Sequence, residues 1–456
     1  MSLFDRTSPP PRGAIRDFDF PTVKRCAVAS GLDLRVVRLP RLPVVSLRLF
    51  MRAGEDALAD TRGGLAVLTA DALEGGTRKR SGSEHAEALE RIGARFGSSG
   101  GWEGTSADVS CLADRLPEAI ALLAEAVREP AFPDAEVERA REQQLAELRQ
   151  RLTDPGALAD DVALRRYFAE GVPYARPVEG TVASLAPVTR AAVAGYAEAC
   201  YRPGGGGLIV AGDVDAREVA SMAEAHLGDW TGDPATSASF AVSPAARERR
   251  VVVVHRPGSV QSEIRVGHVG VERNTPDYFP LTIANMVLGG TFSSRLNLNL
   301  RERHGFTYGV RSRFSFRSRP GPFEISTAVG NAVTAPAVRE IFAELEGFAE
   351  RGPTADEVAA ARDFAAGVFG LQLETAGQVA SRLTQLVIYG LPDAYFHEYR
   401  TCLRAVTADE AAEAARQHMR PADAQVVVVG DADVVASPLE ALDVGPVDVR
   451  RERPAE

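Results

Sequence analysis

Lysine is nearly absent from this chain of 456 residues: only Lys24 and Lys79 occur among its 52 basic residues. Acidic residues number 62, so the formal net charge is −10. A negative chain repels phosphate backbones, which argues against a general nucleic-acid binder and leaves room only for a local basic patch. With 45% hydrophobic and 25% charged residues, the composition is that of a water-soluble globular protein.

Cysteine and long apolar runs are scarce as well. The four cysteines are far apart and form no CxxC pair, so we expect no disulfide framework, and a reducing compartment is compatible. No stretch of about 18 apolar residues occurs, which excludes a membrane-spanning helix. The Pro-rich residues 1–20 contain no apolar run like a signal-peptide core and are expected to form a loose arm. These absences predict a cytoplasmic protein that does not enter a membrane.

The chain is too long for one ordinary core, so two or more domains are expected. Apolar and β-branched runs predict strands, and apolar residues near helical spacing predict helices. The predicted strands are Leu34–Leu39, Val44–Met51, Ala107–Ala113, Leu208–Val210 and Val251–His255, and the predicted helices are Gly64–Leu73, Ser83–Phe96, Leu116–Val127 and Ala135–Leu152.

An internal repeat organises the sequence. Arg202-Pro203 followed by Val210–Asp213 recurs as Arg420-Pro421 followed by Val428–Asp431, at an offset of 218 (420 − 202). Further short matches keep the same order along the chain. One α+β unit of about 210 residues used twice explains this pattern, with chance similarity in an Ala/Arg-rich chain as the alternative.

A stretch rich in Ser, Pro, Ala and Gly, Trp230–Arg250, separates the two copies and is typical of an exposed linker. We therefore predict domains at 20–232 and 250–440, joined by a linker at 233–249.

Two long motifs point to a known family. The first copy contains RAGEDALADTRGGLAVLTADALEGGT (Arg52–Thr77), and the second contains LGGTFSSRLNLNLRERHGFTYGV (Leu288–Val310). In these segments and in their order the chain resembles the pitrilysin/insulinase metallopeptidases, in particular the short branch that includes the mitochondrial processing peptidase. The resemblance covers about residues 30–440. It implies an α+β fold of two homologous domains, each an antiparallel-rich sheet packed with helices, which together form half of a clamshell.

Active members of that family carry an inverted zinc motif, HxxEH, in which two His bind zinc and the Glu is the general base. The matching positions here hold Val67, Ala70 and Asp71. The third ligand position holds Glu147, 76 residues further on (147 − 71). No two of the seven histidines lie within five residues of each other, so no replacement His pair is present. The resemblance thus implies a degenerate zinc site, either a vestigial polar pair or at most a weak site for a hard cation.

The second copy retains another part of the family's catalytic centre. In the family that this chain resembles, the C-terminal domain supplies an Arg and a Tyr, seven residues apart, to the catalytic centre. The segment RERHGFTY has Arg301 and Tyr308 at this spacing. A guanidinium can bind a substrate carbonyl, and a phenol can donate to a developing oxyanion. The bland alternative is a surface ion pair for Arg301 and a core position for Tyr308. The resemblance also implies that the strand near Thr105–Ala113 is an exposed, peptide-binding edge. A purely structural role for this strand is the equal alternative, and no individual substrate-binding residue is predicted.

Three functions follow from these observations. The first is a non-zinc-binding subunit of a heterodimeric zinc metalloendopeptidase, which supplies Arg301 and Tyr308 and no cofactor, while a homologous HxxEH partner holds the zinc. The second is an inert scaffold or substrate-recognition protein of the same fold. The third is a stand-alone enzyme of different chemistry, which lacks support because no GxSxG, Cys–His or dinucleotide-binding motif occurs.

Overall fold

Two six-stranded sheets form the framework of the molecule. The structure is a computed structural model that describes residues 18–233 and 240–451. The first sheet has the strand order β1-β2-β6-β3-β5-β4 and the second β12-β7-β11-β8-β10-β9. The first contains β1 (Val23–Cys26), β2 (Asp33–Arg38), β3 (Val44–Met51), β4 (Arg95–Gly100), β5 (Thr105–Leu112) and β6 (Gly207–Gly212), and the second β7 (Arg250–His255), β8 (Gln261–Val269), β9 (Val310–Phe314), β10 (Pro322–Gly330), β11 (Gln425–Gly430) and β12 (Val447–Arg450).

Five strands of each sheet repeat the same pattern. In the first sheet β2 runs parallel to β6, and β6, β3, β5 and β4 then alternate in antiparallel pairs. In the second sheet β7 and β11 are parallel, and β11, β8, β10 and β9 alternate in the same way. Only the outermost strands differ, because β1 is antiparallel to β2 whereas β12 is parallel to β7. The predicted fold of two homologous, antiparallel-rich α+β domains is confirmed.

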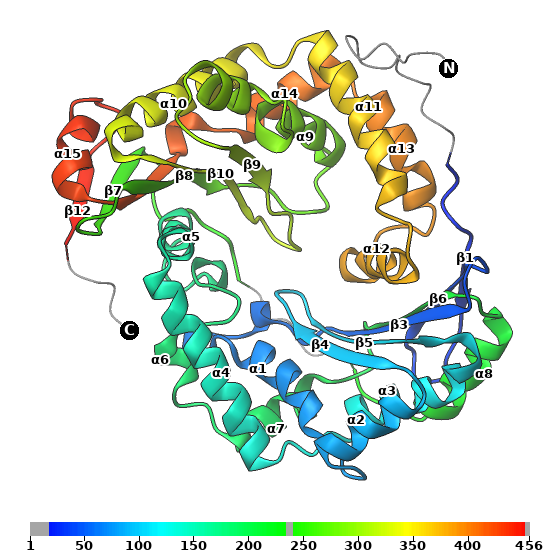
Figure 1. The fold of residues 1–456 in the computed structure, drawn as a ribbon. Coiled ribbons are helices and arrows are strands. Elements are labelled where there is room, and N and C mark those ends of the chain that lie inside the picture. Colours follow the sequence, from blue (N-terminus) through cyan, green and yellow to red (C-terminus); the bar gives the residue numbers. More distant parts are fainter. Residues whose placement is uncertain (1–17, 234–239, 452–456) are drawn as a thin grey trace, which may run out of the picture.

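Most helices cover the outer faces of the two sheets, and the inner faces look toward each other (Figure 1). Buried Val, Leu and Ile side chains of the strands form one core in the first half and another in the second, and the second core extends to Phe50, Ile209 and Ala211 of the first sheet. The helices are α1 (Leu65–Asp71), α2 (Gly82–Arg91), α3 (Leu116–Arg128), α4 (Asp134–Thr153), α5 (Pro155–Tyr167), α6 (Val182–Leu185), α7 (Arg190–Cys200), α8 (Ala216–Leu227), α9 (Tyr278–Asn285), α10 (Thr334–Arg351), α11 (Ala355–Leu371), α12 (Ala376–Tyr389), α13 (Tyr395–Ala405), α14 (Ala408–His418) and α15 (Ala432–Glu440). None of the helices within the described ranges combines the length and the hydropathy needed to cross a bilayer.

The two halves exchange one helix each. Helix α5, from the first repeat, packs on β8 and β11 of the second sheet, while α12, from the second repeat, packs on β3 and β6 of the first (Figure 1). Asp160 of α5 pairs with Arg265 of β8, with 2.5 Å between Oδ1 and Nε. Arg52, just after β3, donates to the Val387 carbonyl of α12 at 2.8 Å. This reciprocal packing ties the domains into one body.

The tips of the homologous hairpins also meet across the boundary. The backbone N–H of Ser318, between β9 and β10, donates to Glu103 Oε1, between β4 and β5, at 3.0 Å. The Arg317 guanidinium lies 4.7 Å from the ring centroid of Trp102 and 4.3 Å from that of Tyr174. Burial is the main cause that raises the pKa of Glu103, and its bond to Ser318 and the charge of Arg317 oppose this.

Three local expectations need correction or qualification. The helix predicted for Ser83–Phe96 ends at Arg91, because Gly93 takes a left-handed φ of 64° and Arg95–Gly100 then forms β4. The strand near Thr105–Ala113 is not an edge: β5 lies between β3 and β4, so β4 is the edge strand. Most of the predicted arm, residues 1–17, lies outside the described residues, as do 234–239 of the linker, whereas Phe240 packs against the core around α5.

Candidate functional site

Helix α1 carries the three positions at which the family's zinc motif falls. It begins after Gly64, whose φ of 88° is readily available only to glycine. Ala70 is fully buried, Val67 is half-buried, and Asp71 ends the helix with its side chain open to solvent. The helix packs against α4 and β4. A hydrogen bond of 2.7 Å from Ser98 Oγ of β4 to the Ala70 carbonyl fixes the edge strand beside Asp71.

A pocket of about 340 Å³ opens between α1 and α4, and both predicted carboxylates line it. Asp71 and Glu74 contribute from the end of α1 and the turn after it, and Glu147 contributes from α4. Glu147 accepts a hydrogen bond of 3.2 Å from Gln143 Nε2. The structure therefore brings Asp71 and Glu147, which the family resemblance implies are ligand positions, to one cavity.

This pocket does not fit a catalytic zinc. Val67 and Ala70 have no ligand atom, and zinc sites in enzymes use three protein ligands, mostly His. In the described part of the chain, no three His, Cys, Asp or Glu donor atoms at this pocket lie within 4.8 Å of one another. The chemistry of the donor set thus disagrees with the metal that the family motif would hold.

We expect the purified chain to contain less than about one tenth of an equivalent of zinc, because Glu147 is the single family ligand left. We also expect it to cleave no peptide on its own, since no side chain occupies the general-base position. Elemental analysis after mild chelation checks the first expectation, and a stoichiometric zinc signal would contradict it.

The Asp71 carboxyl is electrostatically unfavourable when charged. Its pKa is raised to about 6, first because the surrounding pocket wall reduces its hydration and second because of the negative charges of Glu147, Glu74 and Glu179. A folded-state pKa above the unfolded value of about 3.9 means that the folded chain binds the extra proton. Stability is therefore lost as the pH rises from about 4 to 6, and the full cost is present above pH 6.

Accordingly, Asp71→Asn should stabilise the chain at pH 7.5, by about 1 kcal/mol or less because the side chain is solvent-screened. The gain should shrink as the pH falls toward 4, where the wild-type carboxyl is already protonated in the fold. Thermal unfolding of both proteins across this range is the measurement, and a gain that grows at low pH would contradict the assignment.

A buried ion pair, which no sequence pattern predicted, holds the start of α1. Glu55 is fully buried, and its carboxylate accepts from the backbone N–H groups of Gly64 and Ala66 at 2.9 and 2.7 Å. Arg176, whose side chain is only 5% exposed, pairs with Glu55 at 2.9 Å. A carboxylate suits the positive end of a helix. This pair fixes the start of the helix that carries Asp71 at its other end.

Arg301 and Tyr308 lie near β9, in the second half of the chain. Arg301 belongs to a π-helical segment, Asn297–Arg303, and its guanidinium carbon lies 4.2 Å from the ring centroid of Phe292. It also pairs with Glu302 at 3.3 Å. Tyr308 precedes β9 and is 96% exposed. Tyr308 is therefore no core aromatic, whereas Arg301 does make the surface ion pair of the bland alternative.

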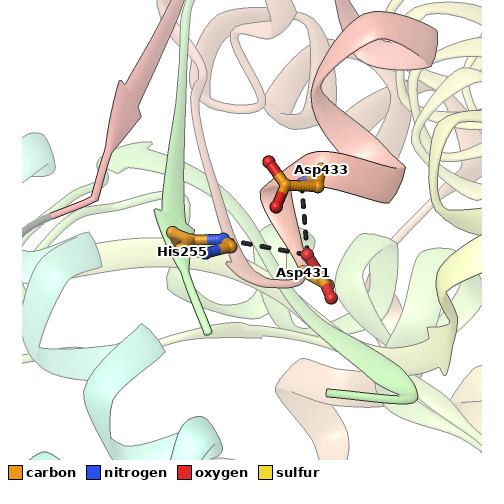
Figure 2. A group of neighbouring side chains, drawn as sticks. All are labelled: His255, Asp431 and Asp433. Atoms are coloured by element: carbon orange, nitrogen blue, oxygen red, sulfur yellow. Dashed lines mark hydrogen bonds and ion pairs between the residues drawn. The ribbon is translucent and has the colours of Figure 1, made fainter. Parts of the chain in front are cut away.

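A third cluster joins His255, Asp431 and Asp433, with possible ligand atoms within 4.8 Å of one another (Figure 2). Each of these side chains already has a partner. Asp431 caps α15 by accepting from the Asp433 N–H at 3.1 Å, and His255 Nδ1 accepts from the Ala432 N–H at 3.1 Å. Asp433 pairs with Arg451 at 2.7 Å. The arrangement is that of a capped helix start.

Two similar sheet-and-helix domains that face each other form a two-domain α+β clamshell. Family profiles agree: "Insulinase (Peptidase family M16)" matches residues 37–173, and "Peptidase M16 inactive domain" matches residues 187–364. The chain belongs to this insulinase-type family.

Relatives and solved structures extend the comparison. A protein named an uncharacterized zinc protease from Streptomyces coelicolor is 25% identical over 79% of this chain and 80% of its own length. Cytochrome b-c1 complex subunit 1 of Bos taurus is 23% identical over 54% of this chain and 51% of its own. A crystal structure from Pseudomonas fluorescens, titled as a peptidase M16 inactive domain, superimposes with a TM-score of 0.82 at 26% identity, covering 90% of this chain and 98% of that one.

Proposed function

We propose that this chain is the non-zinc-binding subunit of a heterodimeric zinc metalloendopeptidase. The observation that carries the proposal is a contrast between its two motifs. Positions 67, 70 and 71 of the metal motif offer a single carboxylate, whereas Tyr308 of the second motif is 96% exposed and free of any packing role. An exposed phenol within a family motif is available to bind a ligand. The zinc is expected in a homologous HxxEH partner.

In this proposal Arg301 and Tyr308 act on the peptide bond to be cleaved. Zinc held by the partner's HxxEH residues would supply the activated water. The Tyr308 hydroxyl would donate a hydrogen bond to the carbonyl oxygen as negative charge develops on it, and the Arg301 guanidinium would orient the same segment of peptide. Phe292 supports Arg301 because its ring face attracts the guanidinium.

The peptide chamber would include the edge of the first sheet. β4 is the last strand of that sheet, so one side of its backbone is available to an added strand. Backbone pairing at such an edge binds extended peptides with little sequence preference. The edge strand β4 packs against α1, so the proposed peptide-binding edge would lie beside the positions that match the zinc motif.

An inert scaffold remains the second candidate. It draws support from the relative named cytochrome b-c1 complex subunit 1 and from the Arg301–Glu302 ion pair. Co-expression with an HxxEH homologue distinguishes the two functions. The peptidase proposal expects a stable heterodimer with zinc in the partner and with peptide hydrolysis that neither chain shows alone, whereas an active partner that gains nothing from this chain would support the scaffold.

A further inference from the structure

We propose that Arg317 is a positioning residue that holds the edge strand β4 of the first sheet in place relative to the second repeat, where Arg301 and Tyr308 lie. The inference deepens the proposed function, on which it rests. In that function β4 is the edge on which the peptide would pair, and Tyr308 is the group that would act on the peptide carbonyl. Arg317 would act through Trp102, in the loop after β4, and not on the peptide itself.

The hairpins that contain the two edge strands are homologous but unequal in length. Strands β4 and β9 hold the same last place in their sheets, so the internal repeat itself provides the comparison. The loop between β4 and β5 has four residues, 101–104, whereas the loop between β9 and β10 has seven, 315–321. The second loop is thus three residues longer (7 − 4), and its tip meets the first loop across the domain boundary (Figure 1). Arg317 belongs to this longer loop.

Aromatic rings of the first repeat receive the Arg317 guanidinium. Its central carbon lies 4.7 Å from the ring centroid of Trp102 and 4.3 Å from that of Tyr174. The two rings are in edge-to-face contact with each other, with 4.9 Å between their centroids. A guanidinium on an aromatic face is held by cation–π attraction, which strengthens where water is excluded. Each repeat therefore supplies one side of this contact.

Few other interactions favour the buried position of Arg317. Burial is the main cause that lowers its pKa to about 10, so the guanidinium stays charged at neutral pH. Its Nη1 is enclosed and has no hydrogen-bond partner among the described residues. Unpaired N–H groups in a protein interior cost free energy. The contacts with the two rings, together with the nearby negative charge of Glu103, therefore offset this cost, and all of these groups belong to the first repeat.

The loop that carries Trp102 is also tied to the start of α1. The backbone N–H of Glu55 donates to the Gly101 carbonyl at 3.0 Å. The Arg176 guanidinium lies 5.3 Å from the Trp102 ring centroid, and Arg176 pairs with Glu55. Trp102 thus joins Arg317 of the second repeat to the ion pair that holds α1. A shift of the loop between β9 and β10 would therefore move the loop after β4 with it.

The first test is backbone hydrogen–deuterium exchange, followed by mass spectrometry, on the full isolated chain. Arg317→Met removes the guanidinium and keeps a long apolar side chain. We expect residues 98–104 and 315–321 to exchange about tenfold faster in this variant, because loss of the ring contacts frees both tips, while β3 and β8 exchange as before. Trp102→Leu removes the other side of the contact and should give the same result. Arg339→Met, which changes an exposed arginine of α10, should leave exchange unchanged.

Two results of this experiment would overturn the inference. Unchanged exchange of both tips in Arg317→Met and Trp102→Leu would show that the contact does not hold the hairpins. Faster exchange of β3 and β8 together with the tips would make Arg317 a residue of general stability. Neither result depends on a partner chain, on zinc or on peptidase activity.

The second test couples Arg317 to Tyr308 in the reconstituted pair with an HxxEH partner. Tyr308→Phe should lower kcat by about 10²-fold in the parent, but by about tenfold or less in the Arg317→Met background, where a displaced peptide no longer meets the hydroxyl. Equal factors in both backgrounds would overturn the positioning role, because independent losses add. Tyr308→Phe at the parent rate would instead refute the proposed function, and the exchange experiment would still decide whether Arg317 joins the two hairpins.

Discussion

In a reconstituted pair with an HxxEH partner, Tyr308→Phe should lower peptide turnover by about 10²-fold or more. The substitution removes one hydroxyl that would donate to the oxyanion, and loss of one such donor typically costs about 10²–10³ in rate. Tyr308 is 96% exposed, so the loss of its hydroxyl disturbs no packing. Because the bond would form in the transition state, kcat should fall more than KM rises. Steady-state kinetics on matched preparations give both constants.

Arg301→Ala should reduce turnover by a similar factor of about 10², for the same reason. Zinc content and the mass of the heterodimer are the controls, and both should be unchanged. Arg303→Ala is a matched variant, since Arg303 is an exposed arginine of the same π-helical segment. Turnover at the parent rate in the Arg301 and Tyr308 variants would refute the shared site and favour the scaffold. Dissociation of the variants from the partner would make the two residues structural.

Much of the fold was predictable, because the strands are apolar over short stretches of sequence and the repeat shows that one unit is used twice. The strand Val44–Met51 appears at the predicted residues, since its alternating buried side chains face a core on one side. The helix predicted to Phe96 was too long, because Ile92 and Phe96 continue a helical spacing across Gly93. Apolar residues on both sides of a glycine turn can belong to two elements, and spacing alone does not separate them.

Features that depend on pairing at a distance were out of reach. The choice of β4 over β5 as the edge is set by strand order, which is a property of the whole sheet. The exchange of α5 and α12 between the sheets is likewise decided by contacts between residues more than 100 positions apart. For the site, the family resemblance singled out Asp71 and Glu147, but no sequence pattern predicts that Tyr308 is exposed, because exposure depends on how the segment before β9 packs.

The buried pair of Glu55 and Arg176 had no sequence pattern at all, since 121 residues separate its members. Breaking this ion pair should change the free energy of unfolding more than Asp71→Asn does. Arg176→Met would leave the Glu55 carboxylate without its counter-ion in a fully buried site, and breaking a buried pair in this way costs about 3–5 kcal/mol. Against a typical domain stability of about 5–15 kcal/mol, that loss is a large fraction.

The free energy of unfolding is measured by denaturant titration followed by tryptophan fluorescence. Both tryptophans, Trp102 and Trp230, lie in the first repeat, which also contains the ion pair. Arg351→Met is the matched control: its ion pair with Glu350 is exposed at 3.1 Å and should contribute about 0–1 kcal/mol. In the double variant Glu55→Gln/Arg176→Met, the loss should be smaller than the sum of the single losses, because neither charge is left buried alone. Additive losses, or a midpoint for Arg176→Met equal to that of Arg351→Met, would show that the pair does not hold α1 in place.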